Sequence, residues 1–154
     1  MAAVTFKNVD IMFGNMKKTI SQAKNSDVCL VIGDKEYLSK KSDLDIKKYS
    51  KLGEGKLVLA FAKGVDIKSL NDLNKDSITR IAMPHPKKAI YGNAAKEYWS
   101  DVKNAKEIEK KLYVVSTVPQ VATYLISKEV DVGFINLTAA LNHKDKIGGY
   151  ILID

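Results

Sequence analysis

The chain has 154 residues, of which 45% are hydrophobic and 28% charged, and its formal net charge is +7. This length is typical of a single domain that buries a core without a metal or disulfide. The composition excludes a disordered or coiled-coil protein, and no apolar run approaches the ~18 residues of a membrane span, so no membrane insertion is expected.

The first half of the chain alternates between strand-like and helix-like segments. Continuous apolar runs are typical of buried strands, whereas apolar residues at helical spacing indicate helices. The expected strands cover residues 4–6, 27–33 and 56–63. The expected helices cover residues 15–25, 34–41 and the short segment 69–73, which Ser69 would cap.

The second half repeats this alternation more clearly. The expected strands cover residues 80–83, 112–116, 132–136 and 150–154. The expected helices cover residues 92–102, 105–111, 118–127 and 138–141. Pro84 and Pro86 stop a strand, and Pro119 stands where the first turn of a helix tolerates proline. Together the segments predict an α/β fold with a largely parallel sheet that is covered on both faces.

The charge pattern and the cysteine content restrict the function. Arg80 is the only arginine, and in residues 103–111 lysines alternate with acids, which favours a solvated helix face. We therefore expect no nucleic-acid partner. Cys29 stands inside an apolar run and is predicted to be a buried core thiol. His85 and His143 are far apart in the sequence and no cysteine cluster accompanies them, so no metal site is expected.

Two strand-to-helix links are candidates for an anion site. Ligands of α/β sheets bind outside the carboxyl ends of the strands, where helix N-termini present unpaired N–H groups. The links are residues 84–92 and 116–119, and each would direct backbone N–H groups into one crevice. Most links between a strand and a helix are only connections. The sequence therefore leaves open whether these two links bind an anion or merely join the elements.

The sequence offers little for catalysis. Neither a Gly-x-Ser-x-Gly elbow nor a phosphate-binding loop occurs. His85, between two prolines, is the one candidate general base in the crevice, and no acid or nucleophile pairs with it. We therefore predict no catalytic residue and no cofactor. A small enzyme that acts on an anionic substrate through His85 is the weakest of three hypotheses.

Four segments resemble one known family in their order and spacing. The segment 80–97 (RIAMPHPKKAIYGNAAKE) is similar to the second-lobe signature of periplasmic molybdate-binding proteins of ABC importers. These belong to the type 2 periplasmic solute-binding family. The other similar segments are 27–37 (DVCLVIGDKEY), 51–60 (KLGEGKLVLA) and 118–136 with its EVDVGF core.

This resemblance implies a two-lobed, periplasmic-binding-protein-like fold that is truncated at both ends relative to the family. Residues 56–136 would form one complete second lobe, with a mainly parallel sheet flanked by helices. Residues 1–55 would form a partial first lobe, and residues 137–154 a return segment with the final strand. A chain with a partial first lobe could complete it by forming a homodimer.

The resemblance also implies a function and a site. The protein would hold a tetrahedral oxyanion such as molybdate or tungstate and deliver it to the membrane subunit of an ABC transporter. The implied donors are the backbone N–H groups of Tyr91 and Val118, beside Gly92. Asn136 takes the position of a family tyrosine, and Gly14 stands in a loop that lacks the family's serine. No bond would be made or broken.

Two locations follow from two versions of this function. A transport protein would act in the periplasm or on the extracellular surface, and a signal peptide would have been removed before Ala2. The alternative is an intracellular effector-sensing domain of the same topology that binds a small anion. A signal peptide upstream of Ala2 would discriminate between them, because a sensor would lack one.

Overall fold

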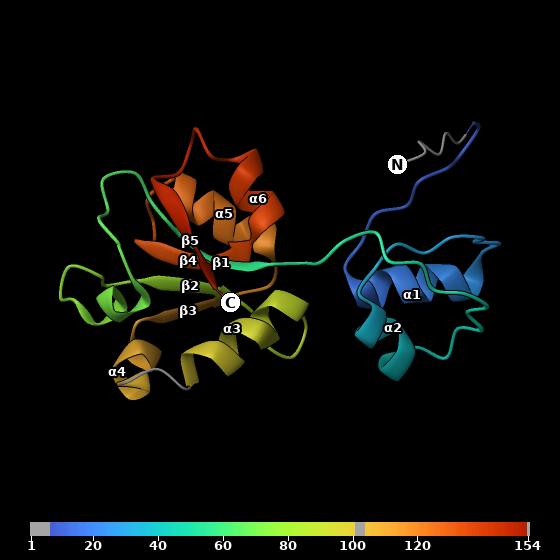
Figure 1. Cartoon of the computed structure of the whole chain (residues 1–154), viewed down its shortest axis with the longest axis horizontal. Helices are drawn as coiled ribbons and strands as arrows, with labels where there is room; N and C mark the ends of the chain where they lie inside the picture. The colour runs from blue at the N-terminus through green and yellow to red at the C-terminus, as the bar shows by residue number, and fades with distance from the viewer. Residues whose placement is uncertain (1–6, 101–103, 154) are drawn as a thin grey trace. The chain divides into compact units, whose positions relative to one another are not determined.

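The computed structural model describes residues 7–100 and 104–153. The chain divides into two compact units, an N-terminal unit of residues 1–52 and a C-terminal unit of residues 53–154 (Figure 1). The strand expected at residues 4–6 lies outside the described residues.

The N-terminal unit contains two capped helices. Helix α1 (Met16–Asn25) begins after Asn15, whose side-chain oxygen accepts a hydrogen bond from the N–H of Lys18 at 2.9 Å. Helix α2 (Lys35–Lys41) begins after Asp34, which accepts from the N–H of residue 37 at 2.7 Å. These caps satisfy N–H groups that lack intrahelical acceptors. Both helices confirm the prediction from the sequence.

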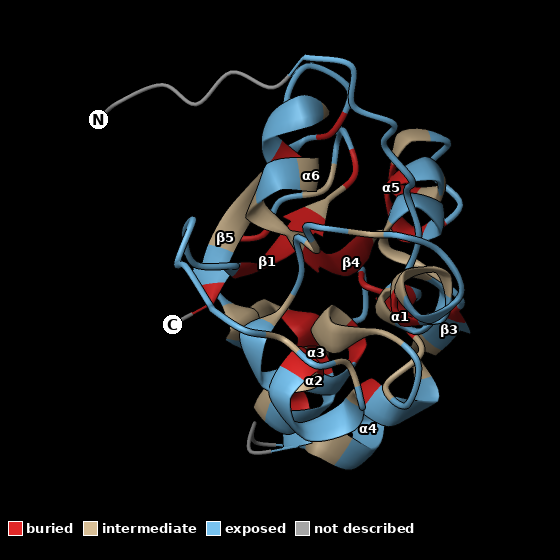
Figure 2. Ribbon diagram, turned by 90° about the vertical axis from the view of Figure 1, so that its right-hand side faces the viewer, coloured by how far each residue is buried: buried red, intermediate tan, exposed pale blue. Residues whose placement is uncertain are grey.

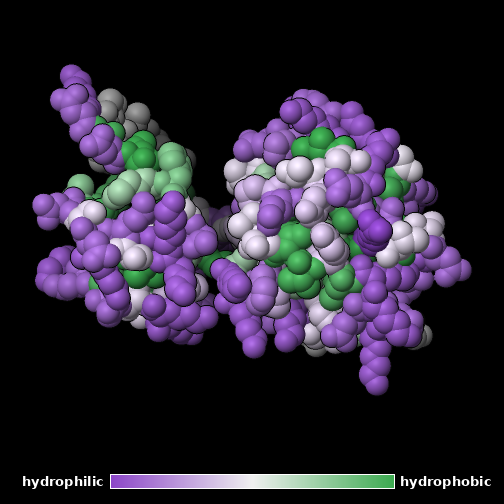
Figure 3. Space-filling model, turned by 180° about the vertical axis from the view of Figure 1, so that it is seen from behind, coloured by the Kyte–Doolittle hydropathy of each residue, from purple (hydrophilic) through white to green (hydrophobic). Residues whose placement is uncertain are grey.

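The strand expected at residues 27–33 is wrong, because no strand forms anywhere in residues 7–52. Cys29, expected to be buried, is exposed, and Leu30 and Ile32 expose 57% and 69% of their surface. A strand needs a neighbour to take up its backbone hydrogen bonds, and the described part of this unit offers none. Hydrophobic side chains consequently remain on the surface of the N-terminal unit, the smaller body in Figure 3.

The C-terminal unit is built around a five-stranded mixed sheet in the order β3-β2-β4-β1-β5. Strand β2 pairs in parallel with β3 and β4, whereas β1 is antiparallel to both β4 and β5. The expected α/β class is confirmed, and β1 alone runs against the other strands. The strands are β1 (Leu57–Phe61), β2 (Ile81–Pro84), β3 (Leu112–Val115), β4 (Val132–Asn136) and β5 (Gly149–Ile153).

Helices cover both faces of this sheet (Figure 1). One face carries α3 (Ile90–Ser100), α4 (Ala105–Lys110) and the 3-10 helix η1 (Leu70–Asn74). The other face carries α5 (Val118–Ile126) and α6 (Leu137–Asn142). The arrangement is therefore a three-layer α/β/α sandwich, as the continuous apolar runs predicted.

The core consists of two layers that the central strands divide between them. In β1, Leu57 and Leu59 face the α3 layer, and Val58 and Ala60 face the α5 and α6 layer. Figure 2 shows the buried residues concentrated in β1, β4 and the inner faces of the helices. Burying one large aliphatic or aromatic side chain stabilises a fold by about 1.5–3 kcal/mol, so these two layers hold the C-terminal unit together.

A single carboxylate aligns the amino ends of β2 and β4. Asp131 Oδ2 accepts hydrogen bonds from the N–H of Thr79 at 2.7 Å, its hydroxyl at 2.9 Å and the N–H of Arg80 at 2.9 Å. These bonds fix where the two strands start, and consequently where their carboxyl ends lie.

Within the described residues, no helix is both long and apolar enough to cross a membrane.

Candidate functional site

The strand directions bring several chain segments to one edge of the sheet. Because β2, β3 and β4 are parallel, their carboxyl ends lie together. The register places Leu57, the first residue of β1, opposite both Asn136 and Ile153. The start of β1 and the end of β5 therefore lie at the same edge, which we call the site edge.

Three helices begin at the site edge. Helix α3 follows β2 and α5 follows β3, each after a short link, and α6 follows β4 directly. The first turn of a helix has N–H groups without intrahelical acceptors and carries the positive end of the helix dipole. The site edge thus gathers three groups of N–H donors.

The two links proposed from the sequence still contain unused donors. In the described part of the chain, the N–H groups of Tyr91 and Val118 donate no hydrogen bond. The N–H of Gly92, by contrast, donates to the carbonyl of Ala89 at 3.1 Å. Helix α3 begins at Ile90, two residues earlier than predicted, so Tyr91 lies in its first turn. Tyr91 and Val118 remain candidate ligands, whereas Gly92 contributes close packing.

Asn136 has a structural role that the sequence did not indicate. It ends β4 and caps α6, since its Oδ1 accepts a hydrogen bond from the N–H of Ala139 at 2.8 Å. This bond fixes the orientation of the side-chain amide. The Nδ2 group is then left as the donor that Asn136 can offer to a ligand.

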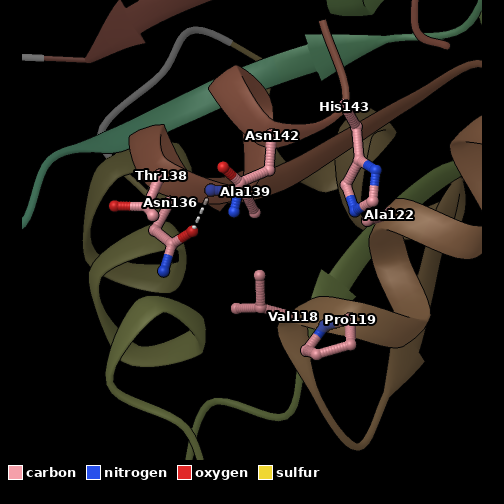
Figure 4. A pocket seen from close by; sticks show the side chains of 8 residues that line it. All are labelled: Val118, Pro119, Ala122, Asn136, Thr138, Ala139, Asn142 and His143. Atoms are coloured by element: carbon pink, nitrogen blue, oxygen red, sulfur yellow. Dashed lines mark hydrogen bonds between the residues drawn. The ribbon is translucent and has the colours of Figure 1, made fainter.

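A pocket of about 310 Å³ opens between α5 and α6 (Figure 4). Val118 and Asn136, two of the predicted site residues, line it together. Tyr91 and Gly92 lie at the site edge but outside the lining, and Gly14 belongs to the N-terminal unit, directly before the cap of α1. The complete lining is Val118, Pro119, Ala122, Asn136, Thr138, Ala139, Asn142 and His143.

Three polar residues of this lining were not predicted. Thr138, Asn142 and His143 come from α6 and its C-terminal cap. The spacing of four between Thr138 and Asn142 puts them on one helix face, and this signal was available in the sequence. The length of α6 was underestimated, however, because residues 138–141 were taken as a single turn.

The lining carries donors but no lysine, arginine, aspartate or glutamate. Thr138 adds a hydroxyl and a backbone N–H that donates no hydrogen bond in the described part of the chain. Lysines stand outside the pocket: Lys56 precedes β1 at the site edge, and Lys87 and Lys88 lie in the link between β2 and α3. They can attract an anion toward the edge without pairing with it.

Neither a metal-binding cluster nor the candidate general base His85 lies at the pocket within the residues that the structure describes. Among the described residues, no three His, Cys, Asp or Glu side chains are grouped to hold a metal ion. His85, the candidate general base, accepts a hydrogen bond at Nδ1 from the N–H of Lys87 at 3.1 Å and does not line the pocket.

Comparison with known proteins identifies a family to which the sequence is similar. Residues 2–153 match the sequence profile of a bacterial extracellular solute-binding protein family. No curated protein has a sequence that matches this chain.

Solved structures share the fold of about two thirds of the chain. The substrate-binding domain of a molybdenum ABC transporter from Clostridium difficile aligns with a TM-score of 0.56 and 21% identity, over 65% of this chain and 42% of its own. The periplasmic molybdate-binding protein of Azotobacter vinelandii gives 0.54 and 23%, over 65% and 45%. A two-component signal-transduction protein gives 0.53 and 14%, over 64% and 37%.

In each case the match spans less than half of the known structure. The matched share of this chain is close to the size of the C-terminal unit, whose sheet forms the site edge. The sequence profile, by contrast, covers nearly the whole chain. The chain therefore belongs to the bacterial extracellular solute-binding protein family.

Proposed function

We propose that this protein binds a tetrahedral oxyanion at the site edge of the C-terminal unit and delivers it to an ABC importer. The observation that carries the proposal is the convergence of three helix N-termini on one edge, where the N–H groups of Tyr91 and Val118 have no acceptor. Helix N-termini with unpaired N–H groups favour bound anions.

The chemistry of the donors suits a small oxyanion. N–H and O–H groups replace the hydration of the oxygens, and hydrogen bonds to a charged acceptor are about twice as strong as neutral ones. Because no lysine, arginine, aspartate or glutamate lines the pocket, selection would rest on the number and direction of donors. Neutral donors also allow release, since no buried ion pair has to be broken.

The ligand and the partner come from the family and its relatives. Two of the similar structures carry names that mention molybdenum or molybdate. We therefore propose molybdate or tungstate as the ligand and the membrane subunit of an importer as the partner. The family description also supports a location in the periplasm or on the extracellular surface.

The first experiment is thermal unfolding with molybdate, tungstate, sulfate and phosphate in turn. A ligand at about 100 times its dissociation constant stabilises the folded state by roughly 2.7 kcal/mol. For a chain of this size the midpoint would rise by roughly 5–10 °C. A rise with one oxyanion supports the proposal, and no rise with any of them contradicts it.

The variant Tyr91→Pro tests the site directly. It removes one N–H donor at the second position of α3, which the first turn of a helix tolerates. The chain already has Pro119 at the second position of α5. The matched control is Tyr91→Ala, which keeps the N–H and removes the same ring. Weaker binding by Tyr91→Pro than by Tyr91→Ala is expected, and equal affinity would show that this N–H is not a ligand.

A sensing role is the second candidate for the same site. The likeness in fold to a two-component signal-transduction protein favours it. The binding chemistry would be identical, and the output would be regulation in place of transport. Cell fractionation with an antibody separates the two, because a transport protein is expected outside the cytoplasm and the proposed intracellular sensor inside it.

The homodimer stays a prediction. The exposed apolar side chains of the N-terminal unit, including Phe13 with 82% of its surface exposed, are the feature that favours it. Light scattering after size-exclusion chromatography would give twice the mass of the chain for a dimer. A monomer mass at high concentration would contradict the prediction.

A further inference from the structure

The backbone of Lys56 is fixed beside the pocket between α5 and α6. Its carbonyl accepts a hydrogen bond from the N–H of Leu137, the first residue of α6, at 2.9 Å. This bond extends the pairing of β1 with β4 by one residue beyond the pair of Leu57 and Asn136. Figure 4 shows β1 in green beside α6, with its start on the side of Asn136 and Thr138. Lys56 is therefore held next to two residues of the pocket lining.

The alternation of β1 decides on which face of the sheet Lys56 stands. Successive side chains of a strand point to opposite faces. Leu57 faces the α3 layer, and Val58 faces the layer of α5 and α6. Lys56 consequently stands on the same face as Val58, and the pocket opens on this face. Because the residue is exposed, we expect its ammonium group in the solvent at the rim of the pocket.

The charge of Lys56 is not engaged with a carboxylate in the described part of the chain. The ion pairs found there involve other lysines, namely Lys24, Lys40, Lys47, Lys75 and Lys110. Lys87 and Lys88 also stand at the site edge, but they lie in the link to α3, which covers the other face of the sheet. Of these three lysines of the site edge, Lys56 is thus the one on the face of the pocket.

We propose that Lys56 selects the ligand by its charge, so that the site prefers dianionic tetrahedral oxyanions to monoanionic ones. This inference rests on the proposed function. N–H and O–H donors recognise the tetrahedral shape, which a monoanion and a dianion share. A nearby positive charge acts on the net charge of the ligand, because the Coulomb energy is proportional to that charge. The free energy that Lys56 contributes is therefore twice as large for a dianion, and the factor in affinity is squared.

The exposure of Lys56 limits the size of the effect. An exposed ion pair strengthens an interaction by up to about fivefold. For a charge at the rim we expect a factor of about two for a monoanion and therefore about four for a dianion. Salt should reduce both factors, because dissolved ions screen exposed charges. A role of Lys56 in packing would depend neither on the charge of the ligand nor on salt.

Molybdate and perrhenate provide the test, because both are tetrahedral and molybdate carries one more negative charge. Calorimetry would measure both anions with the wild type, Lys56→Gln and the control Lys63→Gln. Lys63 is also exposed and follows β1 at the opposite edge of the sheet, so the control removes the same charge far from the site edge. At about 0.1 M salt the Debye length is ~10 Å, which screens this distant charge.

The expected result is a loss that depends on the charge of the ligand. Lys56→Gln should bind molybdate about fourfold and perrhenate about twofold more weakly than the wild type. Lys63→Gln should bind both anions like the wild type. Lys56→Arg keeps the positive charge and should keep both affinities. At about 1 M salt, where the Debye length is ~3 Å, Lys56→Gln and the wild type should bind molybdate equally. This last comparison decides the question even where perrhenate binds too weakly to measure.

The outcomes separate this inference from the proposed function. Equal losses of molybdate and perrhenate binding in Lys56→Gln would overturn the inference, because they would place the effect in packing and not in charge. A loss that persists at high salt, or an affinity for molybdate equal to that of Lys63→Gln, would overturn it as well. An absence of binding of any oxyanion by the wild type would contradict the proposed function, and the inference with it.

Discussion

A Cβ atom at Gly92 would lie 2.3 Å from the carbonyl oxygen of Pro84, so the end of β2 and the start of α3 meet with no room for a side chain. The same atom would lie 2.8 Å from the carbonyl carbon of His85. Both obstacles are backbone, which cannot rotate away as a side chain can. This contact sets the direction in which the first turn of α3 presents its N–H groups.

We predict that Gly92→Ala destabilises the protein by roughly 1–3 kcal/mol, because extra volume in a tight site forces the backbone to shift. The matched control is Gly53→Ala, since nothing lies within 4 Å of a Cβ atom there. Urea unfolding monitored by circular dichroism measures both variants. Equal stability of the two would show that the contact between Gly92 and Pro84 relaxes without cost.

The cap and ligand roles of Asn136 can be separated by two substitutions. Asn136→Ala removes the acceptor for the N–H of Ala139 and should lower the free energy of unfolding by about 0.5–2 kcal/mol. Asn136→Asp keeps an acceptor, so we expect nearly wild-type stability. It replaces the amide donor by a negative charge and should weaken oxyanion binding at least tenfold. Unfolding curves and molybdate titrations check both, and unchanged affinity of Asn136→Asp would remove Asn136 from the site.

Asp72 gives the stability a defined dependence on pH. Its carboxylate accepts from the N–H of Lys68 at 2.8 Å, pairs with Lys75 at 3.0 Å and accepts from the N–H of Ser69 at 3.3 Å. These contacts hold the pKa of Asp72 below its ordinary value. A carboxyl group with a lower pKa in the folded state stabilises that state above its unfolded pKa, about 3.9. The contribution is lost as the pH falls through the lower, folded value.

The test compares wild type with Asp72→Asn at pH 6 and pH 2.5. At pH 6 the variant should unfold at a lower urea concentration, and the difference should shrink as the pH falls toward 2.5, because acid favours the protonated form of the wild-type carboxyl group. The control Asp76→Asn changes a carboxylate that makes no hydrogen bond within the described residues, and should show a smaller difference. A gap for Asp72→Asn that is constant across pH would contradict the assignment.

Cys29 should react readily in the folded protein. It is the one cysteine of the chain and its side chain is exposed. We expect a thiol reagent such as 5,5′-dithiobis(2-nitrobenzoic acid) to label native protein at a rate within about tenfold of the rate in urea, because exposure controls access to the thiol. Cys29→Ser provides the blank. If the native protein resists labelling, the thiol of Cys29 is buried, as the sequence suggested, and the exposed position is contradicted.

The sequence predicted the C-terminal unit well because its patterns are local. The apolar runs that became β1 and β4 are continuous, and proline marks the start of α5 and the end of β2. The direction of β1 was not predictable in this way. An apolar run looks the same in a parallel and an antiparallel strand, and only pairing across the sheet, Leu57 with Asn136, decides it.

The N-terminal unit shows the limit of the same reasoning. The run around Leu30 and Ile32 has the composition of a buried strand, yet burial depends on a partner that the described residues do not supply. Two residues of the site that the sequence suggested, Val118 and Asn136, line one pocket, and their role as ligands stays a prediction. Thr138 and His143 were missed because they join it only through the packing of α6 against α5.

The pairing of Leu57 with Ile153 places the start of β1 beside the end of β5, so both ends of the C-terminal sheet lie at the site edge. Domains with adjacent ends tolerate insertion into a loop of another protein. Residues 53–154 could therefore be inserted as a domain into a loop of a fluorescent protein. Both junctions would lie at the site edge, where the oxyanion is proposed to bind. Binding of the anion would therefore take place next to the points where the fluorescent protein is attached.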